Sequence, residues 1–294
     1  TRAQAPERRL RLGLLVSGYR SESRLSDALI RGLRERGFVE GDNLGFVVRD
    51  IEGRPERYPA LAAELVALAP DIILAPATPA ARAAKQATAV IPVLFVGDPD
   101  PVASGLVASL ARPGGNVTGI SNLGSEIFGK RLEILKQAVP GARRVAYLWR
   151  RGTFPPRTEA EMLQRAGDDA RALGLELLLV EARADLRDAF AEIAAGRADT
   201  LVLNNPDPTL FSQRRRIAEL AAAQKLPTMG NVREFAVDGG MLSYGPDFAA
   251  SFRRIATYVD RIAKGARPGD LAVERAATFE LVVNLRTAAA IGVS

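Results

Sequence analysis

Short hydrophobic segments alternate with amphipathic stretches along almost the whole chain. The first hydrophobic segment is Leu10–Val16, and an amphipathic stretch over 26–36 follows it and ends at Gly37. Glycine directly after the last periodic residue is a common helix end. The predicted strands at 71–75 and 200–203 each begin with a polar residue and continue with apolar residues without alternation, which is typical of strands buried on both faces. The repeated order of strand and helix predicts parallel sheets covered by helices.

The pattern forms two successive sets of elements. In the first set, strands are expected at 10–16, 44–50, 71–75, 91–96 and 117–120, with helices at 26–36, 55–68 and 79–88. In the second set, strands are expected at 144–148, 175–180, 200–203, 227–229, 241–243 and 279–283, with helices at 125–139, 156–173, 186–195, 210–224, 232–237, 247–264 and 285–290. Two sets of about five strands predict two Rossmann-like α/β lobes. A single sheet of about ten strands is the alternative.

The composition limits the chemistry that the chain can perform. The 294 residues are 47% hydrophobic and 25% charged, which is typical of a globular protein, and they include no Cys and no His. Thiol nucleophiles, the Ser-His-Asp triad and His- or Cys-ligated zinc are therefore excluded. Chemistry based on carboxylates, Lys or Tyr stays open. We expect a binding protein that has no cofactor and no metal, and not an enzyme.

The net charge of +6 does not indicate a nucleic-acid partner. Arg occurs along the whole chain and usually beside Glu or Asp, as at 34–36 and 183–185. The densest basic run, 214–216, lies in a predicted helix and is interpreted as a solvated helix face.

The chain carries no apolar stretch long enough to span a membrane. It begins at Thr1 without an initiator Met and without a visible signal peptide, so we interpret it as a processed or trimmed form. An export signal is one candidate for a segment that has been removed.

Polar and aromatic residues gather where the predicted strands end. Ligands of open α/β sheets bind beyond the carboxyl ends of the strands. The ten candidate ligand-binding residues at these ends are Ser17, Tyr19, Thr78, Asp98, Ser121, Trp149, Asn204, Asp207, Asn231 and Tyr244.

These residue types suit a small zwitterion or a polar aromatic ligand. Helix N-termini near Thr78 and Ser121 present N–H groups that can hold a carboxylate. Asp98 or Asp207 can pair with an ammonium group, and the aromatic candidates can stack on a flat ligand. The alternative for the Asp and Asn residues is that they only cap helices or close turns.

Nucleotide binding is not supported by any motif. Residues 124–130 have the spacing of a phosphate-binding P-loop, but Arg131 stands where a Ser or Thr would hold Mg²⁺. The chain also lacks the GxGxxG motif after a strand and the GxSxG motif of a nucleophile elbow.

Several segments together resemble one family. They include GLRERGFVEGDN at 32–43, GLVASLARPGGNVTG at 105–119, GGMLSYGP at 239–246 and FELVVNLRTA at 279–288. The chain resembles, over nearly its whole length, the tryptophan/tyrosine-type ABC transporter substrate-binding proteins, a branch of the type I-like periplasmic binding proteins.

The resemblance implies two lobes that are joined by hinge crossings and close on a ligand in the cleft between them. It implies an N-terminal lobe of 1–120 plus 247–274 and a C-terminal lobe of 121–246 plus 275–294. It also implies an exported protein on the periplasmic or extracellular face of the membrane. This protein is expected to be a monomer that delivers an aromatic amino acid, or another small carboxylate, to an ABC permease in the membrane. Trp149 and Arg150 replace a small Asn/Pro-rich stretch of the family, which narrows the pocket or alters its charge preference.

Two other functions stay open at this stage. The ligand-sensing core of a transcription regulator shares the architecture, but it would need a DNA-binding segment outside this chain. A carboxylate-dependent hydrolase or transferase would have to work without His, Cys or any recognised catalytic motif.

Overall fold

The chain folds into two compact units. The computed structural model describes residues 9–17, 23–122, 127–183, 185–203 and 207–293. Unit 1 comprises Thr1–Asn122 and Phe248–Arg275, and unit 2 comprises Leu123–Asp247 and Ala276–Ser294. Each unit is therefore assembled from two separate stretches of the sequence.

Unit 1 is built on a six-stranded sheet with the order β11-β5-β4-β3-β1-β2. All of its neighbouring strands pair in parallel. The strands are β1 (Leu10–Val16), β2 (Leu44–Asp50), β3 (Ile72–Leu74), β4 (Val93–Asp98), β5 (Val117–Ser121) and β11 (Glu274–Arg275).

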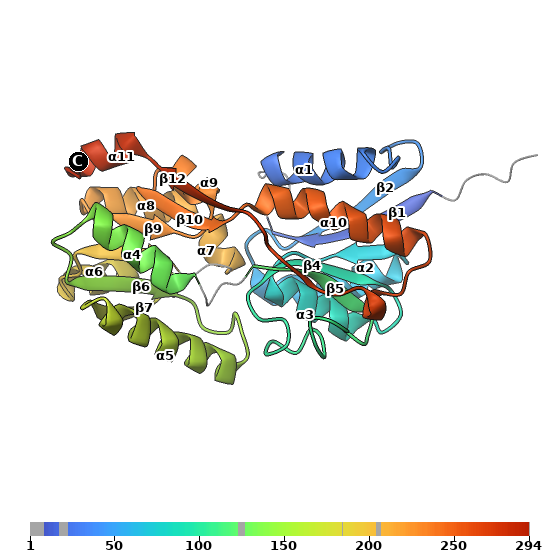
Figure 1. Ribbon diagram of the computed structural model, residues 1–294, viewed down its shortest axis with the longest axis horizontal. Helices are drawn as coiled ribbons and strands as arrows, with labels where there is room; N and C mark the ends of the chain where they lie inside the picture. The colour runs from blue at the N-terminus through green and yellow to red at the C-terminus, as the bar shows by residue number, and fades with distance from the viewer. Residues whose placement is uncertain (1–8, 18–22, 123–126, 184, 204–206, 294) are drawn as a thin grey trace, which may run out of the picture. The chain divides into compact units, whose positions relative to one another are not determined.

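Helices cover both faces of this sheet (Figure 1). Because successive strand residues point to opposite faces, Leu12 and Leu14 of β1 pack with α1 (Ser23–Arg34) and α10 (Phe248–Ala263), whereas Leu15 packs on the other side. That other side is covered by α2 (Tyr58–Ala67), which follows the 3₁₀ turn η2 (Pro55–Arg57), and by α3 (Thr78–Ala87). The 3₁₀ turn η3 (Pro268–Asp270) precedes β11.

Unit 2 repeats the plan with the strand order β12-β10-β9-β8-β6-β7. Its strands are β6 (Arg144–Trp149), β7 (Glu176–Glu181), β8 (Thr200–Leu203), β9 (Thr228–Gly230), β10 (Leu242–Pro246) and β12 (Phe279–Val283). The pairs are parallel except at the edge, where β12 runs antiparallel to β10.

The core of unit 2 also lies between sheet and helices. Side chains from α4 (Phe128–Ala138), α5 (Pro156–Ala172) and α11 (Leu285–Ile291) form one buried cluster with alternate residues of the strands. The helices α6 (Leu186–Ala195) and α8 (Arg214–Ala223) bury apolar residues that are not part of that cluster. Two short helices, α7 (Pro208–Ser212) and α9 (Arg233–Val237), complete the unit.

The predicted fold class is confirmed, because two mainly parallel α/β sheets are present. The alternative of one large sheet is wrong. The predicted helix over 210–224 is also wrong, since two helices, α7 and α8, meet there at Gln213. The two-residue strand β11 was not predicted.

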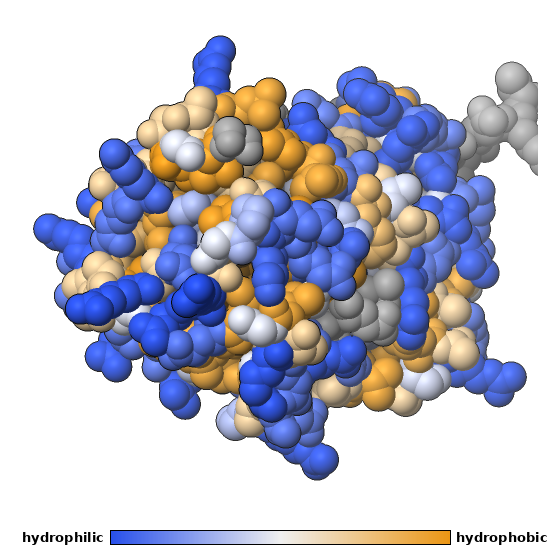
Figure 2. All heavy atoms as spheres, turned by 60° about the vertical axis from the view of Figure 1, so that its left-hand side comes forward, coloured by the Kyte–Doolittle hydropathy of each residue, from blue (hydrophilic) through white to orange (hydrophobic). Residues whose placement is uncertain are grey.

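The basic run at 214–216 is paired with acidic residues. Arg214 and Arg215 both form ion pairs with Asp238, and Arg216 pairs with Glu219. Figure 2 shows hydrophilic side chains, with hydrophobic ones between them, on the face of unit 2 that it brings forward. Within the described residues, no helix combines the length and the hydropathy needed to cross a membrane.

Candidate functional site

Three of the candidate residues meet at the carboxyl edge of the unit 1 sheet. Thr78 begins α3, Asp98 ends β4 and Ser121 ends β5. The Thr78 hydroxyl donates a hydrogen bond of 2.6 Å to Asp98 Oδ2, and the Ser121 hydroxyl donates one of 2.8 Å to the Asp98 carbonyl oxygen. These contacts join the ends of neighbouring strands into one buried polar cluster.

Asp98 is directed into this cluster and not toward solvent. Its side chain is 0% exposed and also accepts hydrogen bonds from the Ser104 hydroxyl (3.0 Å) and from the Asp100 amide (2.8 Å). Burial raises the pKa of Asp98 to about 6, although the hydrogen bonds from Thr78 and Ser104 act in the opposite direction. Because both carboxyl oxygens accept hydrogen bonds from neighbouring residues, Asp98 connects the segments that meet at this edge of the sheet.

A glycine allows β4 to end in this way. The register between β4 and β5 shifts between Val96 and Asp98, and Gly97 lies there with φ of 98°. A Cβ atom at Gly97 would come within 2.9 Å of the Phe248 ring. The left-handed conformation and the close ring together require glycine at this position.

Two polar atoms at the same edge are buried without a partner. Ser17 follows β1 and Asn122 follows β5, and Asn122 is 3% exposed. Within the described residues, neither Ser17 Oγ nor Asn122 Oδ1 makes a hydrogen bond. A buried polar atom without a partner costs about 1–3 kcal/mol. Asn122 was not among the candidates, and its position directly after Ser121 was the only signal in the sequence.

Unit 2 carries a second polar group at the carboxyl ends of its strands. Asp207 is 5% exposed and caps α7, because its Oδ1 accepts a 2.8 Å hydrogen bond from the Leu210 amide. Its Oδ2 accepts a 2.7 Å hydrogen bond from the Thr153 hydroxyl and lies 3.7 Å from Arg150 Nε. The helix-capping alternative for Asp207 is therefore present in the structure.

The remaining candidates of unit 2 differ in their exposure. Trp149 is 8% exposed at the end of β6, with the guanidinium carbon of Arg151 5.4 Å from its ring centroid. Asn231 is 1% exposed and directly follows β9. Tyr244 of β10 is half-buried and stacks on Phe279, with 6.1 Å between the ring centroids. Tyr244 is thus the more accessible of the two aromatic candidates described.

A buried guanidinium group fixes the backbone at Tyr244. Arg131 of α4 is 3% exposed, and its Nε donates a 2.8 Å hydrogen bond to the Tyr244 carbonyl oxygen. Burial lowers the pKa of Arg131 to about 10, which leaves the group charged at neutral pH. Arg131, the residue that argued against a P-loop, therefore connects α4 to the sheet.

Tyr19 and Asn204 lie outside the described residues. The structure brings Thr78, Asp98 and Ser121 together in unit 1, with Ser17 at the end of a neighbouring strand of the same sheet. Trp149, Asp207, Asn231 and Tyr244 belong to unit 2.

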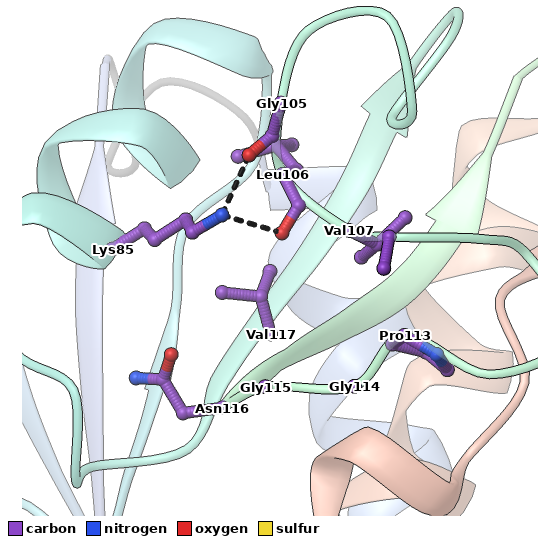
Figure 3. A pocket seen from close by; sticks show the side chains of 10 residues that line it. Lys85, Gly105, Leu106, Val107, Pro113, Gly114, Gly115, Asn116 and Val117 are labelled. Carbon is purple, nitrogen blue, oxygen red and sulfur yellow. Dashed lines mark hydrogen bonds between the residues drawn. The ribbon is translucent and has the colours of Figure 1, made fainter.

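A cavity of about 340 Å³ lies elsewhere in unit 1, near the amino-terminal end of β5. Lys85 reaches into it and donates hydrogen bonds to the carbonyl oxygens of Gly105 (2.6 Å) and Leu106 (3.1 Å) (Figure 3). The lysine thereby holds the loop that lines the cavity. Because β5 starts at Val117 and ends at Ser121, this cavity is at the opposite edge from the candidate residues.

The described side chains provide hydroxyls, amides, a guanidinium group and aromatic rings. Among those residues, no group of three or more Asp and Glu is placed to hold a metal ion. This set can bind a small polar solute through hydrogen bonds and ring contacts.

Comparison with known proteins supports a binding role. The model of a family described as ABC transporter substrate binding protein matches residues 18–294. A relative named tyrosine-binding protein, from Clostridioides difficile (strain R20291), is 25% identical over 257 residues, which are 87% of this chain and 72% of that protein.

Solved structures show the same fold. A conserved domain protein from Vibrio cholerae O1 biovar El Tor has a TM-score of 0.88 and 27% identity, with 97% of this chain and 95% of that chain covered. An ABC domain from Streptococcus pneumoniae, solved in complex with L-Trp, has a TM-score of 0.86 and 22% identity, with the same coverage of both chains.

Proposed function

This chain belongs to the family of ABC transporter substrate-binding proteins, and we propose on that premise that it captures a small carboxylated solute for an ABC importer. The solute class that we propose is the aromatic amino acids. The name of the relative from Clostridioides difficile and the L-Trp complex of the streptococcal structure both support this class.

The observation that carries the proposal is a pair of polar atoms in unit 1 that have no partner within the described part of the chain. Asn122 Oδ1 and Ser17 Oγ are buried at the strand ends where ligands of parallel sheets bind. Their burial is costly unless a bound group supplies the hydrogen bond. An ammonium group or another N–H donor of a solute would supply it. In the proposed complex, Asn122 accepts a hydrogen bond from the solute, and Ser17, which lies beyond β4 and β3 in the sheet, accepts one from a separate donor group.

We propose that binding occurs by closure of two lobes that correspond to units 1 and 2. A solute that contacts both lobes only in the closed state shifts the population toward that state by its difference in affinity. Small-angle X-ray scattering should then show a smaller radius of gyration with the solute than without it. An unchanged radius of gyration at saturating solute would rule out closure of the lobes but would leave binding itself intact.

The test of the proposed function is isothermal titration of the purified protein with L-Trp, L-Tyr and L-Phe. We expect saturable binding of at least one of them, at micromolar affinity, which corresponds to about 8 kcal/mol. Trp149 is the only Trp of the chain, so its fluorescence gives a second readout with L-Tyr and L-Phe. The absence of binding to all three amino acids would rule out this solute class.

The proposed setting is extracytoplasmic, with the protein acting as a monomer beside a membrane permease. Family members are binding proteins, so we expect the bound solute to be recovered unchanged after incubation. The family match favours this role over the sensing core of a transcription regulator.

A further inference from the structure

Arg150 lies at the carboxyl end of the unit 2 sheet, and the described residues leave part of its hydrogen-bonding capacity unused. It directly follows β6, and its side chain is 32% exposed. Within the described part of the chain, its guanidinium group makes one charged contact, the 3.7 Å approach of Nε to Asp207 Oδ2, and donates no hydrogen bond. A guanidinium group has five N–H donors, so Arg150 keeps most of its capacity for another group.

Asp207 is placed to orient the Arg150 side chain, but it does not accept hydrogen bonds from the Arg150 guanidinium group. Its two oxygens already accept hydrogen bonds from Thr153 Oγ1 at 2.7 Å and from the Leu210 amide at 2.8 Å. The buried carboxylate therefore has a fixed position at the start of α7. Its charge attracts Arg150, while the distance of 3.7 Å leaves the guanidinium donors available for a second anion.

The neighbouring arginine provides a contrast. The side chain of Arg151 is 70% exposed, and its Nε lies 3.4 Å from Glu181 Oε1. Its guanidinium carbon also lies 5.4 Å from the centroid of the Trp149 ring. Glu181 and Trp149 thus contact the guanidinium group of Arg151 at the surface. Arg150 is partly buried, and the carboxylate beside it, that of Asp207, already accepts hydrogen bonds from other groups.

From this arrangement we infer that Arg150 binds the carboxylate of the captured solute, with Asp207 as its positioning residue. This inference rests on the proposed function and assigns the anion-recognising group to unit 2. Planar guanidinium groups match carboxylates in two parallel hydrogen bonds, and such charge-assisted bonds are the stronger ones in proteins. The structure thereby favours a solute with a free carboxylate over the corresponding amine.

The experiment compares three solutes with three forms of the protein by isothermal titration. The solutes are L-Tyr, 3-(4-hydroxyphenyl)propionate, which lacks the amino group, and tyramine, which lacks the carboxylate. The proteins are the wild type, Arg150→Met and the matched control Arg151→Met. Met keeps much of the apolar side chain but removes the guanidinium group. Circular dichroism of both variants checks that they are folded.

We expect Arg150→Met to weaken binding of L-Tyr and of the propionate by about 30-fold, because a hydrogen bond to a charged group contributes strongly. Arg151→Met should retain wild-type affinity for both. Tyramine should bind the wild type weakly, and Arg150→Met should not weaken it further.

Three outcomes would overturn the inference. One such outcome is that Arg150→Met binds L-Tyr with the affinity of the wild type. A second is that its affinities for tyramine and for L-Tyr fall by the same factor. In either case Arg150 does not recognise the carboxylate. The proposed function then stands. If the wild type binds none of the three solutes, the inference falls together with the tyrosine-like solute class.

Discussion

At the scale of single residues, two neighbouring strand ends in unit 1 carry opposite properties. Asp98 is fully buried and accepts hydrogen bonds from Thr78, Ser104 and Asp100, so its role is to hold the edge of the sheet. Asn122 is almost as buried but leaves Oδ1 without a partner among the described residues. Both carboxyl oxygens of Asp98 are thus engaged within the fold, whereas Asn122 Oδ1 is not, and a ligand-binding role of either residue stays a prediction.

The substitution Asn122→Ala separates these two roles. It removes a buried atom that has no partner among the residues that the structure describes, so we expect thermal stability without ligand to stay equal or to rise. It should weaken binding of the amino acid that the wild type binds by about 10-fold, because one hydrogen bond to the solute is lost. Titration calorimetry and thermal melting check the two effects.

Asn116→Ala is the matched control for Asn122→Ala. The Asn116 side chain donates hydrogen bonds of 2.9 and 2.8 Å to the carbonyl oxygens of Thr88 and Ile91. We expect this variant to lose stability and to keep its affinity. Equal affinity of Asn122→Ala and the wild type would contradict the role proposed for Asn122.

The pKa of Asp98 predicts a dependence of stability on pH. Burial raises this pKa from 3.8 to about 6, so between these values the folded chain keeps a proton that the unfolded chain has lost. The stabilising contribution of this proton is therefore fully present below about pH 3.8 and is lost as the pH rises through about 6. The loss amounts to about 3 kcal/mol.

The variant Asp98→Asn should remove this part of the pH dependence. The hydroxyls of Thr78 and Ser104 can accept hydrogen bonds from an amide, so the variant should fold. Urea denaturation between pH 4 and 6.5 should give a flatter profile than that of the wild type. Asp42→Asn, at an exposed turn position, should follow the wild type. An equally steep profile for Asp98→Asn would show that Asp98 does not titrate as described.

The sequence identified the edge of the sheet but not every role of the residues there. A polar residue after a strand gives the same sequence signal whether it holds the fold or faces a ligand. Ser121 was chosen and Asn122 was not, and only the Ser121 contact with the Asp98 carbonyl oxygen separates the two. The ligand-binding roles of the candidate residues therefore stay predictions.

At the scale of elements, most predicted segments are present, including the short strands β3 and β9, and the exceptions are β11 and the break between α7 and α8. β1 and β2 agree with the predicted ranges, because each is a seven-residue strand in which apolar residues predominate. β11 has two residues and exists through its pairing with β5, which no local pattern reveals. The break between α7 and α8 arises because Asp207 caps a separate short helix, whereas the apolar period continues through it.

Gly245 sets how closely β9 and β10 approach. A Cβ atom at Gly245 would lie 1.8 Å from the Asn231 carbonyl oxygen. We expect Gly245→Ala to lower the free energy of unfolding by about 1–3 kcal/mol. The variant should also weaken solute binding, because Asn231 would have to move.

Gly141→Ala is the control for Gly245→Ala, since a Cβ atom at Gly141 meets nothing within 4 Å. It should match the wild type or be more stable by about 0.4–1 kcal/mol. Chemical denaturation and titration calorimetry measure both variants. Wild-type stability of Gly245→Ala would show that the strands separate more easily than their spacing indicates.

At the scale of the whole molecule, the two sheets share one strand order. The order β11-β5-β4-β3-β1-β2 in unit 1 corresponds to β12-β10-β9-β8-β6-β7 in unit 2. β1 and β6 therefore occupy equivalent places, and the residues after them are Ser17 and Arg150. Equivalent positions carry a neutral acceptor in one unit and a cation in the other.

The assembly of unit 1 from two distant stretches affects how the protein is made. Leu29 and Leu33 of α1 share a buried cluster with Ile255 and Val259 of α10, which is synthesised more than 200 residues later. Glu35 and Arg253 form an ion pair between the same two segments. Until α10 has emerged from the ribosome, the apolar side chains of unit 1 that pack against α10 stay exposed to solvent. During that part of translation, the nascent chain carries an exposed apolar surface of the kind that chaperones bind.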